Sequence, residues 1–160
     1  MTTSTTGDPA TRSGSNPEER CAFYRNEYCL PAVVDPVARR IVLPVGGLVG
    51  AVSMPRDLGR RVLAGLRVRM LGGPVIERPR TERWTFITGP GHKPNEAVFA
   101  DLLRFGASVA PLGDHVVLPS PDDERLDLWR WECKPTARGD FPPQSAVIAT
   151  TRAMTASAAR

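Results

Sequence analysis

Prolines and glycines interrupt this chain so often that its helices and strands must be short. The 160 residues include 16 prolines and 14 glycines, the residue types that most often end a helix or a strand. Hydrophobic residues make up 41% of the chain and charged residues 24%, as in ordinary globular domains. The length is enough for one domain with its own core. The sequence therefore predicts a single domain built from many short elements.

The two ends of the chain are predicted to lie outside this domain. Residues 1–16 are mostly threonine, serine, glycine and proline, so they have little apolar surface to bury and are expected to form a disordered tail. The folded domain is expected at 17–154, with a frayed C-terminus at 155–160. The longest apolar run, 41–54, is broken by Pro44 and three glycines, so no membrane span is expected.

Four segments carry helix signals. Pro17 suits the first turn of a helix, with Glu18 and Glu19 near its positive end. Asn95 is a plausible N-cap for another helix, and Gly106 follows the end of that helix. The predicted helices span residues 17–28, 55–70, 95–105 and 144–154.

Three of these helices have apolar positions that are expected to face the core. In the first, they are Cys21, Tyr24, Tyr28 and Phe23. In the second, a turn of about 100° per residue places them on one arc, which comprises Leu58, Val62, Leu63, Leu66 and Met70. In the third, they are Val98, Phe99, Leu102, Leu103 and Phe105.

The segments between the helices favour strands, because they are rich in β-branched residues or alternate between apolar and polar positions. Strands are expected at 32–34, 39–45, 48–54, 74–78 and 83–88, then on both sides of a turn at 112–114, and finally at 129–132. Turns at 35–38, 79–82 and 112–114 would make three hairpins. The sequence thus predicts an α+β fold: a mostly antiparallel sheet built from hairpins, with three to four helices packed on it.

Net charge and cysteines set broad limits on function. The formal charge is +4 and the pI about 9.4, a basic excess that permits contact with nucleic acid without requiring it. The cysteines Cys21, Cys29 and Cys133 are odd in number and form no CxxC pair, which favours free thiols in a reducing cytoplasm. Their spacing with His115 fits no structural zinc pattern, so we expect no metal and no cofactor.

Several basic and aromatic residues are candidates for binding nucleic acid. The second helix carries Arg56, Arg60 and Arg67 together beside its apolar arc, where they could contact phosphates or simply face water. Trp129 and Trp131 would share one face of a strand with Arg130 on the other, which suits either base stacking or an ordinary core. His115 begins a strand and could handle a phosphate, or its ring could bond to nearby backbone. For each of these residues, a structural role is more common in proteins than a role in binding nucleic acid.

One acidic cluster raises the question of metal-dependent chemistry. It comprises Asp122, Asp123, Glu124 and Asp127. Two-metal phosphoryl transfer needs carboxylates held rigidly around shared ions. These four follow a proline in a segment without apolar alternation, so they are expected to form a solvated loop. Motifs of P-loop, nucleophile-elbow and zincin type do not occur in the sequence.

The stretch LGDHVVLPSP…LDLWRWE resembles the last part of the bifunctional primase/polymerase N-terminal domain, which is of the archaeo-eukaryotic primase type. Members often show a glycine turn, a "VV-x-P-P/S" step and a strand ending in Tyr/Trp-Arg-Trp; here these are Gly113–Pro121 and Trp129–Glu132. Arg83–Phe86 stands where the family carries its "GG-x-His-x-Tyr-Phe" strand, and 73–78 would be the paired strand. The similarity covers 48–132.

Two departures from the family pattern bear on activity. The family's acid-x-acid pair ends a buried strand, but residues 49–55 contain no carboxylate, and Trp84 stands in place of the histidine. The resemblance therefore implies an inherited fold with an inactive centre and residual binding of nucleic acid or nucleotide. The chain also resembles short proteins of GC-rich bacteria, some of which carry the name RNA polymerase β subunit, although it contains no RNA-polymerase motif.

Three functional hypotheses follow from the sequence. The first is a non-catalytic primase/polymerase-like domain that binds nucleic acid or nucleotide weakly. The second is a protein-interaction module that uses an exposed sheet to contact a replication or transcription protein. The third is an active nucleotidyltransferase with an unconventional site.

Overall fold

The computed structural model describes residues 16–136 and 139–158, and these residues form an α+β fold with two antiparallel sheets. The predicted fold class is confirmed. The predicted tail lies outside the described residues, apart from Asn16. No helix in the described ranges is long and apolar enough to cross a membrane.

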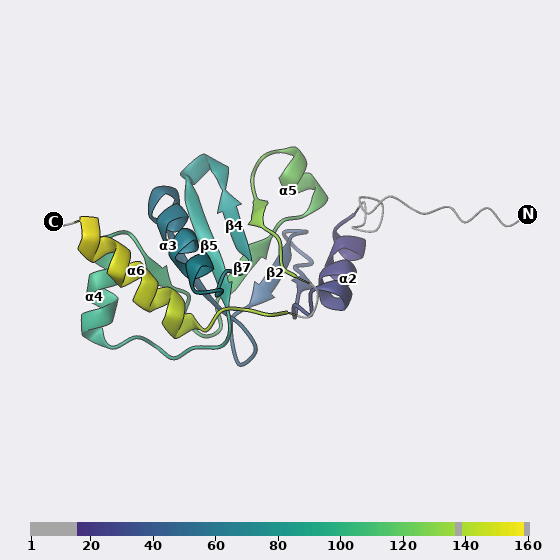
Figure 1. Cartoon of the computed structure of the whole chain (residues 1–160). Helices are drawn as coiled ribbons and strands as arrows, with labels where there is room; N and C mark the ends of the chain where they lie inside the picture. The colour runs from purple at the N-terminus through teal and green to yellow at the C-terminus, as the bar shows by residue number, and fades with distance from the viewer. Residues whose placement is uncertain (1–15, 137–138, 159–160) are drawn as a thin grey trace, which may run out of the picture.

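The described residues contain five α-helices and one short 3-10 helix (Figure 1). They are α2 (Pro17–Glu27), α3 (Arg56–Val68), α4 (Glu96–Arg104), α5 (Pro121–Arg125), α6 (Gln144–Ala158) and η1 (Pro79–Thr81). The strands are β1 (Val33–Val34), β2 (Ile41–Pro44), β3 (Gly50–Pro55), β4 (Val75–Arg78), β5 (Arg83–Thr88), β6 (Ser108–Val109), β7 (His115–Leu118) and β8 (Arg130–Cys133).

The larger sheet has the strand order β6-β3-β5-β4-β8, and the smaller has β1-β2-β7. The predicted hairpins β1–β2 and β4–β5 are present, with Val34 opposite Ile41 and Arg78 opposite Arg83. All strand pairs in both sheets are antiparallel.

The predicted hairpin across 108–118 is wrong, because its two strands belong to different sheets. β6 pairs with β3 and β7 pairs with β2. The connecting segment is held by β3 and by the residue that follows β2: Ala110 N–H donates to the Ala51 carbonyl, and Gly113 N–H donates to the Val45 carbonyl. Long-range pairing with β2 and β3 thus replaces the local hairpin.

The larger sheet is the middle layer of the molecule. One face packs against α3 and α6 through a core that includes Val52, Trp84 and Phe86. The opposite face contributes Ile76 and Ile87 to a second core, which is shared with α2 and the smaller sheet. Figure 1 shows α3 and α6 on one side of the molecule and α2 on the other. Since side chains alternate along a strand, the two faces of this sheet carry different residues.

Close packing fixes α3 on the sheet. Gly59 lets the helix approach β5, because a Cβ atom at this position would lie 2.7 Å from Cε3 of Trp84. Four residues of the predicted apolar arc are buried, but Met70 is 92% exposed. The helix ends at Val68, and Met70 has a φ of 57°, so its side chain leaves the arc.

In α4, α5 and α6, some of the predicted caps, ends and buried positions are confirmed and others are wrong. In α4, Asn95 caps the helix as predicted, but only Leu102 of the apolar face is buried. The segment predicted as an acidic loop contains α5, which begins with a capping box between Ser120 and Asp123. α6 continues to Ala158 instead of ending at Met154.

Candidate functional site

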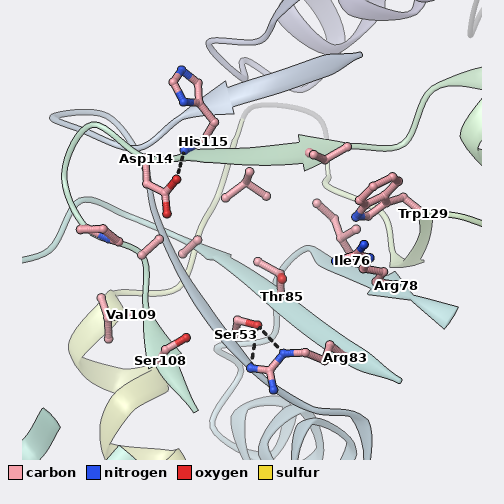
Figure 2. A pocket seen from close by; sticks show the side chains of 15 residues that line it. Ser53, Ile76, Arg78, Arg83, Thr85, Ser108, Val109, Asp114, His115 and Trp129 are labelled. Atoms are coloured by element: carbon pink, nitrogen blue, oxygen red, sulfur yellow. Dashed lines mark hydrogen bonds between the residues drawn. The ribbon is translucent and has the colours of Figure 1, made fainter. Parts of the chain in front are cut away.

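A cleft lies between the larger sheet and strand β7, on the face of the sheet turned away from α3 (Figure 2). Its volume is about 420 Å³, within the range of about 300–1,000 Å³ that is common for ligand pockets. The side chains that give it chemical character are Ser53, Arg78, Arg83, Thr85, Ser108, Asp114, His115 and Trp129. They come from both sheets, so the packing of the two sheets creates the cleft.

A row of hydroxyl groups crosses the floor of the cleft. Ser53 on β3 lies opposite Thr85 on β5 and also opposite Ser108 on β6. Residues opposite each other in antiparallel strands project to the same face, so the three hydroxyls share one side of the sheet. Hydroxyl groups both donate and accept hydrogen bonds, which suits them to contact phosphate or sugar oxygens.

Two arginines stand directly opposite each other beside this row. Arg78 ends β4 and Arg83 begins β5, and the two are register partners in the hairpin around η1. Like charges directly opposite each other destabilise an antiparallel pair. Within the described residues neither guanidinium forms an ion pair with a carboxylate. No carboxylate of the described residues therefore pairs directly with either guanidinium at the cleft.

The two arginines turn apart and make different contacts. Arg83 donates to Ser53 Oγ from Nε at 3.3 Å and from Nη2 at 3.1 Å, and Nη2 also donates to the Gly106 carbonyl at 2.9 Å. Arg78 lies over the Trp129 ring, with Cζ 5.0 Å from the ring centroid. Figure 2 shows Arg83 at the hydroxyl row and Arg78 beside Trp129. The cleft thus has one arginine at its floor and one at its aromatic wall.

Trp129 is a half-buried aromatic wall flanked by cations. Arg40 also lies over its ring, with Cζ 4.5 Å from the centroid. Cation–π contacts of this kind hold both the indole and the guanidinium groups in place. A base stacked on Trp129, as the sequence suggested, would have to share the indole ring with Arg40 and Arg78.

His115 lies at the cleft entrance, but its ring is directed away from the floor. The residue is exposed, and its backbone N–H donates to Asp114 Oδ1 at 2.8 Å. In Figure 2 the imidazole points away from Ser53 and Thr85. Asp114 is the only acid among the described residues that line the cleft.

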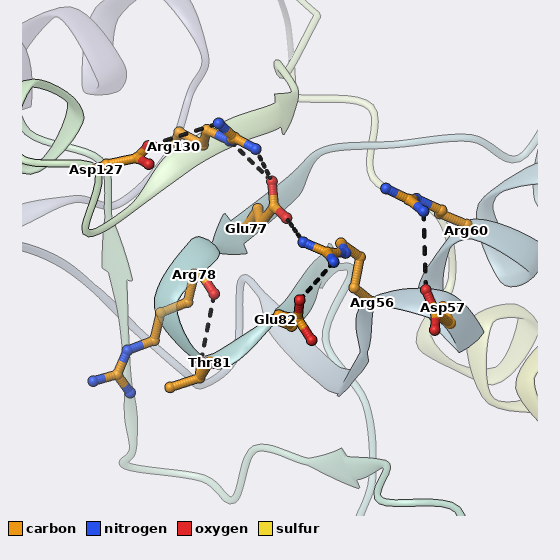
Figure 3. A network of polar contacts seen from close by, with 9 residues as sticks. All are labelled: Arg56, Asp57, Arg60, Glu77, Arg78, Thr81, Glu82, Asp127 and Arg130. Carbon is orange, nitrogen blue, oxygen red and sulfur yellow. Dashed lines mark hydrogen bonds and ion pairs between the residues drawn. The ribbon is translucent and has the colours of Figure 1, made fainter.

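The predicted site residues Arg56 and Arg130 belong to a different structure, an ion-pair network around Glu77 (Figure 3). The Glu77 side chain is 2% exposed and accepts hydrogen bonds from Arg56 at 3.3 Å and from Arg130 at 2.7 and 2.9 Å. Arg56 also donates to Glu82 at 2.8 Å. Burial raises the pKa of the Glu77 carboxyl, but the bonds and charges of Arg130 and Arg56 outweigh it, and the pKa lies below its ordinary value of 4.5.

The other predicted residues are dispersed. On α3, Arg60 Nη1 lies 3.9 Å from Asp57 Oδ1. Arg67 Nη2 lies 4.0 Å from Cys133 Sγ. Trp131 is in the second core, where its Nε1–H donates to Tyr24 Oη at 3.0 Å. Of the seven predicted site residues, His115 and Trp129 line the cleft, and the arginines of α3 lie on the opposite side of the sheet.

The carboxylates of the acidic cluster have partners within the protein. Asp123 accepts a hydrogen bond from the backbone N–H of the N-cap Ser120, Asp122 pairs with Arg125 and Glu124 pairs with Arg20. Asp127 lies 3.6 Å from Arg130. Across residues 16–136 and 139–158, no group of three or more His, Cys, Asp or Glu side chains could hold a metal ion. Cys21, Cys29 and Cys133 form no disulfide.

Comparisons with protein-family models, curated proteins and solved structures gave no significant match. The resemblance to the primase/polymerase domain therefore stays a prediction.

The sequence did contain a signal for the cleft arginines. The predicted hairpin around 79–82 already sets Arg78 opposite Arg83, so an uncompensated like-charge pair could have been read from its register. The hydroxyl row was harder to find, because Ser108 joins Ser53 only through the long-range pairing of β6 with β3.

Proposed function

We propose that this protein is a non-catalytic, primase/polymerase-like domain that binds a phosphate-bearing ligand, single-stranded nucleic acid or a nucleotide, in the cleft between its sheets. The observation that carries the proposal is the facing pair Arg78 and Arg83, which points to the cleft without carboxylate partners among the described residues. A like-charge pair of this kind adds no stability to the fold, and a bound phosphate would compensate it.

The other contacts of the cleft support the same class of ligand. Ser53, Thr85 and Ser108 would offer hydroxyls to phosphate or sugar oxygens. Trp129 and the apolar side chains of β7 would contact a base or sugar. The positions of β3 that face the cleft are Ala51 and Ser53, and the strand contains no carboxylate, whereas the family that the chain resembles carries an acid pair at the end of the corresponding strand. This supports binding without the metal-assisted transfer that such carboxylates perform.

Binding is tested by fluorescence anisotropy of a labelled oligothymidylate at low salt, with an unlabelled nucleoside triphosphate as competitor. Arg78→Ala/Arg83→Ala should weaken binding at least about tenfold, since each charged contact is worth about 1.5–3 kcal/mol. The matched control is Arg60→Ala/Arg67→Ala, which removes the same charge from α3 on the opposite side of the sheet. Equal weakening by both double variants would refute the cleft as the site, and no binding at low salt would remove the nucleic-acid proposal.

A protein-interaction module is the second candidate, and one observation favours it. Three apolar residues of α4 and its C-cap are exposed: Phe99 by 48%, Leu103 by 58% and Phe105 by 36%. This surface replaces the exposed sheet that the sequence suggested, because both faces of the larger sheet pack against other elements. Association with a replication or transcription protein through α4 would be abolished by Phe99→Ser/Leu103→Ser, whereas oligothymidylate binding would persist.

A further inference from the structure

A second cavity lies on the other side of segment 109–111, which also forms part of the wall of the cleft. Its volume is about 380 Å³, and most of its lining is apolar. Val49 is buried in this wall, whereas Phe99 and Leu112 are 48% and 74% exposed. A cavity with a buried apolar wall and exposed apolar residues can enclose the hydrocarbon part of a small molecule.

One polar side chain in this cavity lacks a partner. Gln144 is 5% exposed as a residue, and its amide makes no hydrogen bond within the described residues, but the amide atoms are not completely buried and line the cavity. An amide that lines a cavity and has no partner in the protein is a group that a ligand could hydrogen-bond in place of water.

The Gln144 amide occupies space that is open because Gly50 and Gly91 have no side chains. A Cβ atom at Gly91 would lie 1.7 Å from Gln144 Oε1, and one at Gly50 would lie 2.6 Å from Nε2. Any larger residue at either position would displace the amide. The side chain is therefore held in place by close packing, although no hydrogen bond holds it.

The charge around the amide is positive. Lys93 lines the same cavity, and none of the described lining residues is acidic. Lys93 forms no ion pair among the described residues. Gln144 is also the first residue of α6, a helix of 15 residues, and the N-terminus of a helix favours negative charge. A lysine, an amide donor and a helix N-terminus together favour a carboxylate.

We infer that this cavity binds a small apolar carboxylate, with its acid group at Gln144 and Lys93 and its hydrocarbon part between Phe99 and Leu112. The acid would accept hydrogen bonds from the Gln144 amide and the Lys93 ammonium, and charge-assisted bonds of this kind are among the strongest in proteins. The site is separate from the proposed phosphate contacts, since Arg78 and Arg83 do not line this cavity.

The test uses octanoate and its uncharged methyl ester as probes, titrated into the full chain by calorimetry. Octanoate should bind at least about tenfold more tightly than the ester, which corresponds to about 1.4 kcal/mol. Lys93→Met and Gln144→Met should each raise the octanoate Kd about tenfold or more. Lys134→Met, which removes the same charge from a lysine outside the cavity, should leave the Kd within about twofold.

Several results would overturn the inference. They are no octanoate binding at millimolar concentration, equal binding of acid and ester, or equal weakening by Lys93→Met and Lys134→Met. Lys93 is exposed, so its substitution tests the site even where Gln144→Met impairs folding. Arg78→Ala/Arg83→Ala should leave octanoate affinity unchanged, so failure of this site and failure of the phosphate cleft give different results.

Discussion

Replacing Glu77 by glutamine should cost this protein far more stability than any change to its exposed carboxylates. The Glu77 side chain is 2% exposed and accepts three hydrogen bonds from two arginines (Figure 3). Glutamine keeps the shape and one acceptor oxygen but loses the charge. The arginines would then face a neutral group in place of their counter-ion.

The expected loss follows from the exposure of the partners. Removing one member of a fully buried ion pair costs about 3–5 kcal/mol. Here the Arg130 side chain is 49% exposed and the Arg56 side chain 27%, so water can replace part of the lost interaction. We therefore expect Glu77→Gln to lower the free energy of unfolding by about 2–3 kcal/mol. The control Glu82→Gln removes an acceptor of the same Arg56 that is 67% exposed, and should cost about 0.5 kcal/mol.

Urea unfolding at neutral pH, followed by tryptophan fluorescence and circular dichroism, measures both values. Acid adds a second test. Because the folded pKa of Glu77 lies below 4.5, its contribution is complete above the unfolded value and is lost as the pH falls through the folded value. As the pH falls below about 4.5, the free energy of unfolding should therefore decrease less in Glu77→Gln than in the wild type. Equal costs for the two variants at neutral pH would refute the reasoning.

Three further predictions concern other parts of the chain. Deleting 1–15 should leave the melting temperature unchanged, whereas Asn16→Ala should cost about 1 kcal/mol, because Asn16 Oδ1 caps α2. Tyr24→Phe should cost about 1–3 kcal/mol in urea unfolding, since the buried hydroxyl donates to the Pro119 carbonyl at 2.5 Å. Burial raises the pKa of Tyr24 to about 12, although the hydrogen bonds from Arg20 and Trp131 act to lower it. The stability that the Tyr24 hydroxyl contributes should therefore be lost in the wild type as the pH rises from about 10 through 12, and Tyr24→Phe should show no such loss. Primer-extension assays should show no template-dependent incorporation with magnesium or manganese, and incorporation that Asp123→Ala abolishes would contradict this.

Local patterns predicted the elements well, because each depends on neighbours in the sequence. The proline at 17, the cap at Asn95 and the turn at 79–82 all specify structure within a few residues. The same signals misled at 108–118, where a glycine turn between two short strands favours a hairpin. The competing pairings with β2 and β3 join residues 55 to 77 positions apart, and no local pattern contains them.

The candidate site was harder to predict than the fold. The helical wheel predicted that the arginines of α3 share a face beside the apolar arc, but it could not show that a buried acid from β4 would bind Arg56. Trp129 and Trp131 share one core as their spacing suggested, yet only Trp129 lines the cleft. Which basic residues remain without carboxylate partners depends on how the two sheets pack.

The salt dependence of oligothymidylate binding tests the central claim most directly. For a single strand, the slope of log K against log salt falls by about 0.7 for each phosphate contact that is lost. If Arg78 and Arg83 both contact phosphates, Arg78→Ala/Arg83→Ala should reduce the wild-type slope by about 1.4, and Arg60→Ala/Arg67→Ala should leave it unchanged. An unchanged slope in the first variant, or an equal reduction in the second, would contradict a phosphate-binding cleft between the sheets.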